Sequence, residues 1–203
     1  MSRVVVVTHL TLDGVMQAPA RPDEDLRGGF AHGGWATPYG DAVMGRVMAE
    51  GMAQSEGGAL LFGRRTYQDF FSVWPNRTDN PFTVVLNTMQ KYVASTTLEE
   101  PLPWSNSTLL KGDAAEAVAR LKEQPGKDLV ILGSGELAQS LMRRNLIDGY
   151  LLTIHPLVLG SGRRLFPDGG AFAALRLVDT KTTTTGVVIA TYQPAESTAG
   201  KAV

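Results

Sequence analysis

Residues 130–141 read VILGSGELAQSL and contain the junction that decides the fold. The apolar run that begins at residue 129 ends at Gly133-Ser134-Gly135, and a stretch with helical spacing follows at once. A continuous apolar run of this length is typical of a strand buried on both faces of a parallel sheet. The sequence therefore predicts a buried strand that passes through a glycine turn into a helix.

This glycine turn has two interpretations. The first N–H groups of a helix are unpaired and lie at the positive end of its dipole, which suits a pyrophosphate. Gly133, Gly135 and Ala138 also match the G-x-G-x-x-A dinucleotide fingerprint. A Rossmann fold would need an acidic residue about 20 positions later, yet the next strand ends at His155-Pro156. The alternative is that the glycines only permit a tight connection.

A second stretch, LLFGRRTY at residues 60–67, repeats the order of strand, glycine and helix. Arg64 and Arg65 fall in the first helical turn, where the dipole favours acidic side chains. An anion that neutralises both guanidinium groups explains them most simply, and a solvated surface pair is the alternative. NADPH carries a pyrophosphate and a separate ribose phosphate, so it would need two such sites in one sheet.

Composition narrows the class of protein. The 203 residues are 43% apolar and 19% charged, which fits one packed domain at residues 1–193 and a flexible tail at 194–203. The net charge of −1 and the lack of a basic stripe make nucleic acid an unexpected partner. The absence of cysteine excludes disulfides, thiolate metal sites and cysteine nucleophiles, and three scattered histidines do not indicate zinc. The N-terminal valine run is too short for a signal peptide or a membrane span, so we expect a cytoplasmic protein.

Hydrophobic spacing gives the order of elements. It predicts an α/β fold with a mostly parallel sheet and an antiparallel end. The expected strands are 3–9, 57–63, 81–87, 91–95, 107–110, 128–133 and 149–160, followed by a hairpin at 175–194. The expected helices are 40–54, 64–74, 112–126 with an aspartate cap at Asp113, and 136–145 with arginines in its last turn.

Taken in order, five segments resemble the dihydrofolate reductase-like family, and most closely the riboflavin-biosynthesis reductase (RibD C-terminal) domain and its stand-alone bacterial relatives. The segments are LTLDGVM (10–16), FGRRTY (62–67), KYVASTTL (91–98), VILGSGELAQSL (130–141) and IHPLVLGSGRRLF (154–166). The resemblance covers about residues 3–193. It implies a three-layer α/β/α sandwich with an antiparallel C-terminal hairpin, a small-molecule substrate and a homodimer.

The resemblance also implies an NADPH site. It assigns the pyrophosphate and the ribose phosphate to Gly63, Arg64, Arg65 and Thr66, and the adenosine side to Asn87, Thr88 and Ser95. It assigns the turn over the pyrophosphate to Gly133, Ser134, Gly135, Glu136 and Leu137. In the mobile loop that closes over nicotinamide, it assigns Val15, Met16 and Ala18.

Four further residues are expected on the substrate side. Asp13 either contacts substrate or forms a turn, because aspartate before glycine favours turns. Asp41 either serves as the carboxylate that binds a pterin and assists protonation, or is an aspartate at the N-terminus of the first helix that favours the helix dipole. Trp35 and Tyr39, in the glycine-rich segment 26–40, form a wall on which a planar ring stacks.

These residues predict an NADPH-dependent reductase that transfers hydride to a planar pteridine- or pyrimidine-type heterocycle or its ribosyl derivative. The first alternative is a non-catalytic NADPH- or nucleotide-binding protein of the same fold. The second is a general phosphosugar-binding module. The residues at Arg163 and Arg164 could also bind a substrate phosphate, although riboflavin-type relatives carry other residues there.

Overall fold

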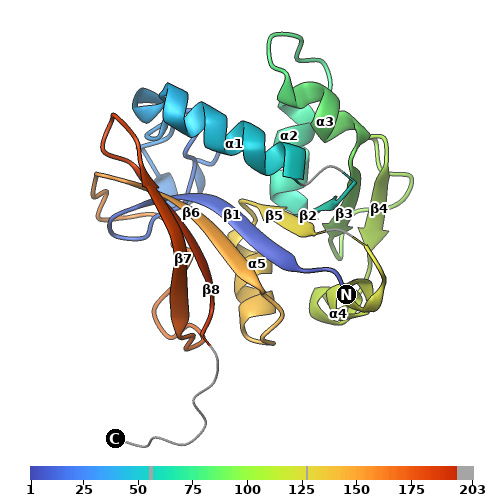
Figure 1. Cartoon of the computed structure of the whole chain (residues 1–203). Coiled ribbons are helices and arrows are strands. Elements are labelled where there is room, and N and C mark those ends of the chain that lie inside the picture. Colours follow the sequence, from blue (N-terminus) through green and yellow to red (C-terminus); the bar gives the residue numbers. More distant parts are fainter. Residues whose placement is uncertain (55–56, 127, 196–203) are drawn as a thin grey trace, which may run out of the picture.

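The computed structural model describes residues 1–54, 57–126 and 128–195. This part of the chain forms an eight-stranded sheet with the strand order β4-β3-β2-β5-β1-β6-β8-β7 (Figure 1). The strands β1 to β6 pair in parallel, whereas β8 lies antiparallel to β6 and β7. Their bounds are β1 Val4–Thr11, β2 Ala59–Gly63, β3 Gln90–Ala94, β4 Ser107–Leu110, β5 Leu129–Leu132, β6 Gly149–His155, β7 Leu175–Thr182 and β8 Val188–Pro194.

Helices cover both faces of the sheet and complete the predicted three-layer sandwich (Figure 1). On one side lie α1 (Ala42–Gln54), α2 (Arg64–Val73) and α3 (Phe82–Thr88), and on the other lie α4 (Ala114–Glu123) and α5 (Gly135–Met142). Successive strand residues point to opposite faces. Leu60 and Phe62 therefore pack with α2 and α3, while Leu61 and Ile131 pack with α4 and α5. The predicted fold class is confirmed.

A local sequence signal explains the start of α4. The Asp113 side chain caps α4 by accepting hydrogen bonds from the amides of Ala115 and Glu116, as predicted. The helix α5 ends at Met142, so the arginines at 143 and 144 follow it and do not occupy its last turn. The strand β8 runs to Pro194, and residues 196–203 of the expected tail lie outside the described residues.

One predicted strand is wrong. Residues 81–87 were expected to be extended because of their β-branched apolar run, but Phe82–Thr88 form the short helix α3. The Asn80 side chain accepts a hydrogen bond from the Phe82 amide at 2.9 Å, which favours a helical start. Thr83 and Leu86 are buried on this helix, so tertiary packing overrides β propensity.

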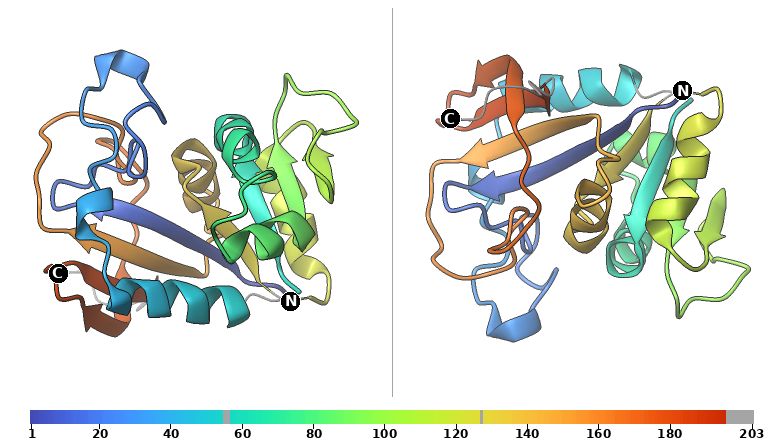
Figure 2. Two further views of the ribbon diagram at one scale, coloured as in Figure 1. Left: turned by 90° about the horizontal axis from the view of Figure 1, so that it is seen from above. Right: turned by 90° about the horizontal axis from the view of Figure 1, so that it is seen from below.

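The segment between β1 and α1 stands beside the end of β1 in both views of Figure 2. It contains two short 3-10 turns, Arg27–Gly29 and Thr37–Tyr39. Its apolar residues Val15, Ala18, Phe30 and Trp35 form a small core of their own. None of the helices in the described ranges has the length and apolar character needed to cross a bilayer.

Candidate functional site

A cleft of about 1470 Å³ lies along the carboxyl ends of the central parallel strands, where open α/β sheets bind ligands. Its lining includes an apolar group from α1, α2 and α3: Met48, Phe70, Val73, Trp74 and Leu86. It also includes a polar group from the strand ends: Gly63, Arg64, Arg65, Thr66, Ser95, Gly133, Ser134, Gly135, Glu136 and Leu137. The cleft thus offers apolar surface for a ring and polar surface for anions.

The glycine turn between β5 and α5 leaves helix amides free. Gly133 has a φ of 58° and Ser134 a φ of 49°, both in the left-handed region that glycine tolerates best. Ser134 is the N-cap residue, but its side chain does not cap the helix. Within the described chain, the amides of Gly135, Glu136 and Leu137 have no hydrogen-bond acceptor. These N–H groups are available to an anion.

The strand–glycine–helix junction at β2 lies directly beside this turn. The strands β2 and β5 are neighbours, with Leu61 paired to Ile131. The Gly63 amide donates a 3.1 Å hydrogen bond to Ser134 Oγ. An added Cβ at Gly133 would lie 3.5 Å from Thr66 Cγ2, so the first turn of α2 also touches the glycine turn. One ligand can therefore reach both helix N-termini.

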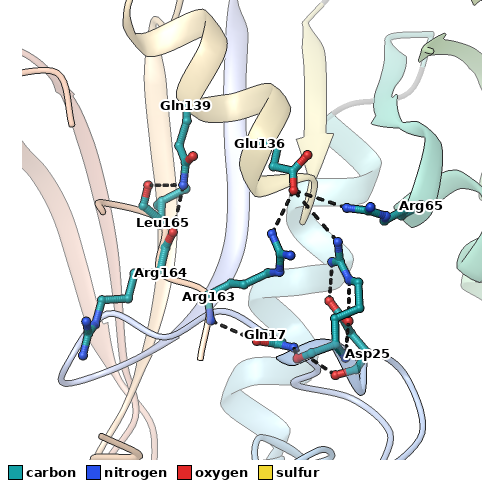
Figure 3. A network of polar contacts seen from close by, with 9 residues as sticks. Gln17, Asp25, Arg65, Glu136, Gln139, Arg163, Arg164 and Leu165 are labelled. Carbon is teal, nitrogen blue, oxygen red and sulfur yellow. Dashed lines mark hydrogen bonds and ion pairs between the residues drawn. The ribbon is translucent and has the colours of Figure 1, made fainter. Parts of the chain in front are cut away.

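Three guanidinium groups converge on one carboxylate at the cleft wall (Figure 3). The Glu136 Oε1 atom lies 2.8 Å from Arg163 Nη1, 3.3 Å from Arg65 Nη1 and 3.9 Å from Arg27 Nη1. Arg27 also pairs with Asp25. Arg64 differs from them, because its only side-chain contact in the described ranges is a 3.4 Å bond to Gln68. Arg64 is therefore the free cation at the N-terminus of α2.

The loop after β1 reaches the glycine turn. Met16 and Ala18, the residues expected on the nicotinamide side, both line the cleft. The Met16 sulfur lies 2.6 Å from the position that a Cβ on Gly135 would occupy. Val15 does not line the cleft, because it is fully buried in the small core with Phe30.

The two candidate catalytic aspartates lie outside the cleft lining. Asp13 holds the turn at 159–160: its carboxylate accepts hydrogen bonds from the Thr11 hydroxyl and from the amides of Leu159 and Gly160. These bonds, the Thr11 bond foremost, lower the pKa of Asp13. These contacts agree with the turn-forming alternative for Asp13, and its catalytic role stays a prediction.

Asp41 likewise takes the alternative role that its sequence position allowed. Its carboxylate accepts hydrogen bonds from the Met44 amide, at the start of α1, and from the Thr184 amide and hydroxyl. The Met44 bond is the main cause that lowers the pKa of Asp41. Asp41 thus joins α1 to the β7–β8 turn and is not among the residues that line the cleft, and its catalytic role stays a prediction.

The expected aromatic wall and adenosine side also differ from prediction. Trp35 and Tyr39 are absent from the cleft lining and pack edge-on against the buried His155 ring. Asn87 and Thr88 end a helix and not a strand; Asn87 Oδ1 accepts a 2.7 Å bond from the Trp104 indole. The Thr88 hydroxyl bonds the carbonyls of its own helix. Only Ser95 of this group lines the cleft.

Among the cleft residues that the sequence analysis did not predict are two polar ones with informative contacts, Gln17 and His9. Gln17 is buried and joins the loops: its side-chain nitrogen donates to the carbonyls of Asp25 and Arg27, and its oxygen accepts from the Arg163 amide. His9 of β1 also lines the cleft. Its place in the valine run gave the one available signal, because a polar residue on a buried strand needs a partner.

Comparisons with known proteins agree with this geometry. The model of the RibD C-terminal domain family matches residues 2–189. The uncharacterized protein YyaP of Bacillus subtilis (strain 168) is 31% identical over 138 residues, which are 66% of this chain and 72% of YyaP. A solved chain from Shewanella sp. PV-4, described as a riboflavin biosynthesis protein, has a TM-score of 0.70 at 21% identity, covering 95% of this chain and 99% of that chain. Dihydrofolate reductase from Enterococcus faecalis has a TM-score of 0.56 at 13% identity, covering 95% and 96%.

Proposed function

The chain belongs to the RibD C-terminal domain family, and from this premise we propose that it is an NADPH-dependent reductase. Its substrate is a planar pteridine- or pyrimidine-type heterocycle or a ribosyl derivative. The observation that carries the proposal is the meeting of two uncapped helix N-termini in one cleft. The Enterococcus faecalis dihydrofolate reductase, which shares the fold, was solved with NADP(H).

The polar lining fits a dinucleotide phosphate. The free amides of Gly135, Glu136 and Leu137 would hold the pyrophosphate, since unpaired helix N–H groups favour anions. Arg64 lies at the N-terminus of α2 without a carboxylate partner among the described residues, so it would hold the ribose phosphate. NADPH supplies a hydride when bound, while the chain positions the reactants and excludes water.

The apolar lining fits a flat ring. Phe70, Val73 and Trp74 of α2 and Met48 of α1 are cleft residues from two helices on the same side of the sheet. Aromatic and thioether side chains favour the faces of planar rings. This surface supports a heterocyclic substrate over a simple phosphosugar, which carries no apolar face of that size.

Cofactor titrations with an Arg64→Ala variant test this proposal. The change in NADPH fluorescence on binding gives the Kd for NADPH, and displacement of NADPH by NADH gives the Kd for NADH. Losing one charged hydrogen-bonding group removes about 1.5–3 kcal/mol, so NADPH affinity should fall about 10- to 100-fold while NADH affinity stays the same. Arg176→Ala, on the exposed edge strand β7, is the matched control. Equal losses for both cofactors, or none, would contradict the assignment.

A non-catalytic binding protein of the same fold is the alternative. Tight NADPH binding without oxidation across a panel of pterins and ribosylaminopyrimidines would favour it.

We also propose a homodimer, supported by the terminal strand β7, whose Leu177 and Val178 are 49% and 46% exposed. Sheet edges with apolar side chains favour association. Sedimentation of Leu177→Lys against the unmodified chain tests the dimer.

A further inference from the structure

Two histidines that are 146 residues apart form a hydrogen-bonded pair beneath the cleft. His9 lies on β1 and His155 ends the neighbouring strand β6, and His9 Nδ1 is 2.9 Å from His155 Nε2. His9 lines the cleft, whereas His155 is fully buried behind it. The roles proposed above use neither side chain.

The surroundings of the pair keep both rings neutral. The rings of Trp35 and Tyr39 pack edge-on against His155, with centroids 5.1 Å and 5.4 Å away. No carboxylate among the described residues pairs with either imidazole. Burial lowers the pKa of His9 to about 4, and burial together with the charge of His9 lowers that of His155 to about 4.

The position of the shared proton follows from the far side of His155. A neutral imidazole has one N–H donor and one acceptor nitrogen. His155 Nδ1 is buried and has no partner. A buried N–H without an acceptor is rarer and costlier than an unfilled lone pair. His155 therefore carries its proton on Nε2 and donates it to His9 Nδ1, so His9 carries its own proton on Nε2.

The Nε2 atom of His9 is the open end of this pair. It has no hydrogen-bond partner in the described ranges, and it is not among the buried polar atoms that lack one. Beside it on β6 lies Thr153, which is fully buried, lines the cleft and has an unpartnered hydroxyl. Two polar side chains without protein partners at one place in a cleft indicate a ligand group that satisfies them.

We propose that His9 is a catalytic residue, whose neutral Nε2–H donates a hydrogen bond to the heteroatom of the reducible C=O or C=N bond, and that His155 is the positioning residue that fixes this tautomer. The substrate is then a ring with a carbonyl oxygen or imine nitrogen at the reacting edge, and Thr153 binds the atom next to it. This inference rests on the proposed function.

The chemistry needs a donor at this place. When the carbon of the double bond gains a hydride from NADPH, negative charge builds on its oxygen or nitrogen. A fixed N–H donor stabilises that charge in a water-poor site, and a neutral imidazole can act in this way. The heteroatom then takes a proton from water, so one C–H and one O–H or N–H bond form and NADP⁺ remains. His9 keeps its own proton throughout.

Nuclear magnetic resonance tests the tautomer without any substrate. Long-range ¹H–¹⁵N correlation spectra of the ¹⁵N-labelled chain report which ring nitrogens are protonated, and His9→Gln assigns the signals. We expect His9 to carry its proton on Nε2, and His155 to do the same, with both rings neutral near neutral pH. A proton on Nδ1 of His9, or an imidazolium at either position, would overturn the inference.

Paired variants test the catalytic role. His9→Leu removes the donor and should lower kcat about 100-fold with the panel compound that is reduced fastest, as loss of one such donor does elsewhere. His9→Gln keeps an N–H donor and should recover most of that loss. NADPH affinity should not change in either variant. Turnover by His9→Leu at the unmodified rate would overturn the role of His9.

His155 variants separate positioning from folding. In His155→Gln the side-chain amide can still donate to His9 Nδ1, so kcat and the His9 tautomer should be retained, whereas His155→Leu should lose both. Equal kcat in the two variants would contradict the positioning role. Failure of the proposed function would look different, because the unmodified chain would then either not bind NADPH or bind it without reducing any compound of the panel.

Discussion

Gly135→Ala separates the phosphate cradle from the fold. The φ of Gly135 is not in the left-handed region, so alanine fits the backbone there. Its Cβ would lie 2.6 Å from the sulfur of Met16 and 3.3 Å from its methyl carbon. These atoms form the end of a flexible side chain that can rotate away. Alanine has less conformational freedom than glycine in the unfolded chain, and this stabilising effect offsets the crowding against Met16. The free energy of unfolding should therefore change by about 1 kcal/mol or less.

Cofactor affinity should respond far more than stability. The new methyl group would stand at the first turn of α5, where the free amides of Glu136 and Leu137 meet a phosphate. Loss of one charge-assisted hydrogen bond to the phosphate lowers the binding free energy by about 1.5–3 kcal/mol, which raises the Kd about 10- to 100-fold. NADPH and NADH share the pyrophosphate, so both should weaken equally. Arg64→Ala should instead weaken NADPH alone.

Fluorescence titration and thermal unfolding of three variants complete the test. Met16→Ala alone measures the affinity lost with the Met16 side chain, and adding Gly135→Ala to it should weaken binding by the same factor as Gly135→Ala does in the unmodified chain. Recovery of affinity in the double variant would show that Met16 crowding, and not the cradle, caused the loss. Unchanged binding by Gly135→Ala would refute the assignment of this turn to a phosphate.

Three further predictions concern stability and charge. The pKa of Asp13 is lowered in the folded chain, so this carboxylate stabilises the fold above its ordinary pKa, and the stabilisation is lost as pH falls through the lowered value. In Asp13→Asn the free energy of unfolding should therefore depend less on pH in the acid range, and the Kd for NADPH should not change. Tyr67→Phe leaves the buried amide of Trp104 without its 3.0 Å acceptor and should lower the urea-derived unfolding free energy by about 1–3 kcal/mol. Glu136→Gln removes the carboxylate that pairs with three arginines, which leaves their charges available to the phosphates. Calorimetry should therefore show tighter NADPH binding with a steeper dependence on salt concentration. Weaker binding would show that the ligand needs this carboxylate.

The glycine turn that we propose to hold phosphate was the part of the candidate site most readable from the sequence. A strand that ends in glycine and passes directly into a helix places unpaired helix amides at the carboxyl end of the strand, and this local feature can be read from the sequence. The sequence could not show that β2 and β5 are neighbours, because strand order depends on packing between distant segments. The same glycines at two unconnected strand ends would have had no common ligand.

The predictions that failed depended on tertiary context. The apolar residues at 81–87 fit a strand or a short helix, and packing of Leu86 selected the helix, which moved Asn87 away from the cleft. The aromatic side chains Trp35 and Tyr39 cover a buried histidine and not a ligand. The partner of His9 is 146 residues away, so no local pattern indicated the pair.

A crystal structure of the NADPH complex would show whether α2 and α5 hold one cofactor. We expect the pyrophosphate within hydrogen-bond distance of the amides of Gly135 to Leu137, the ribose phosphate at Arg64, and the nicotinamide ring over β1 near His9. A dinucleotide that touches only one of the two helix N-termini, or that lies outside this cleft, would contradict the claim that α2 and α5 together hold one cofactor.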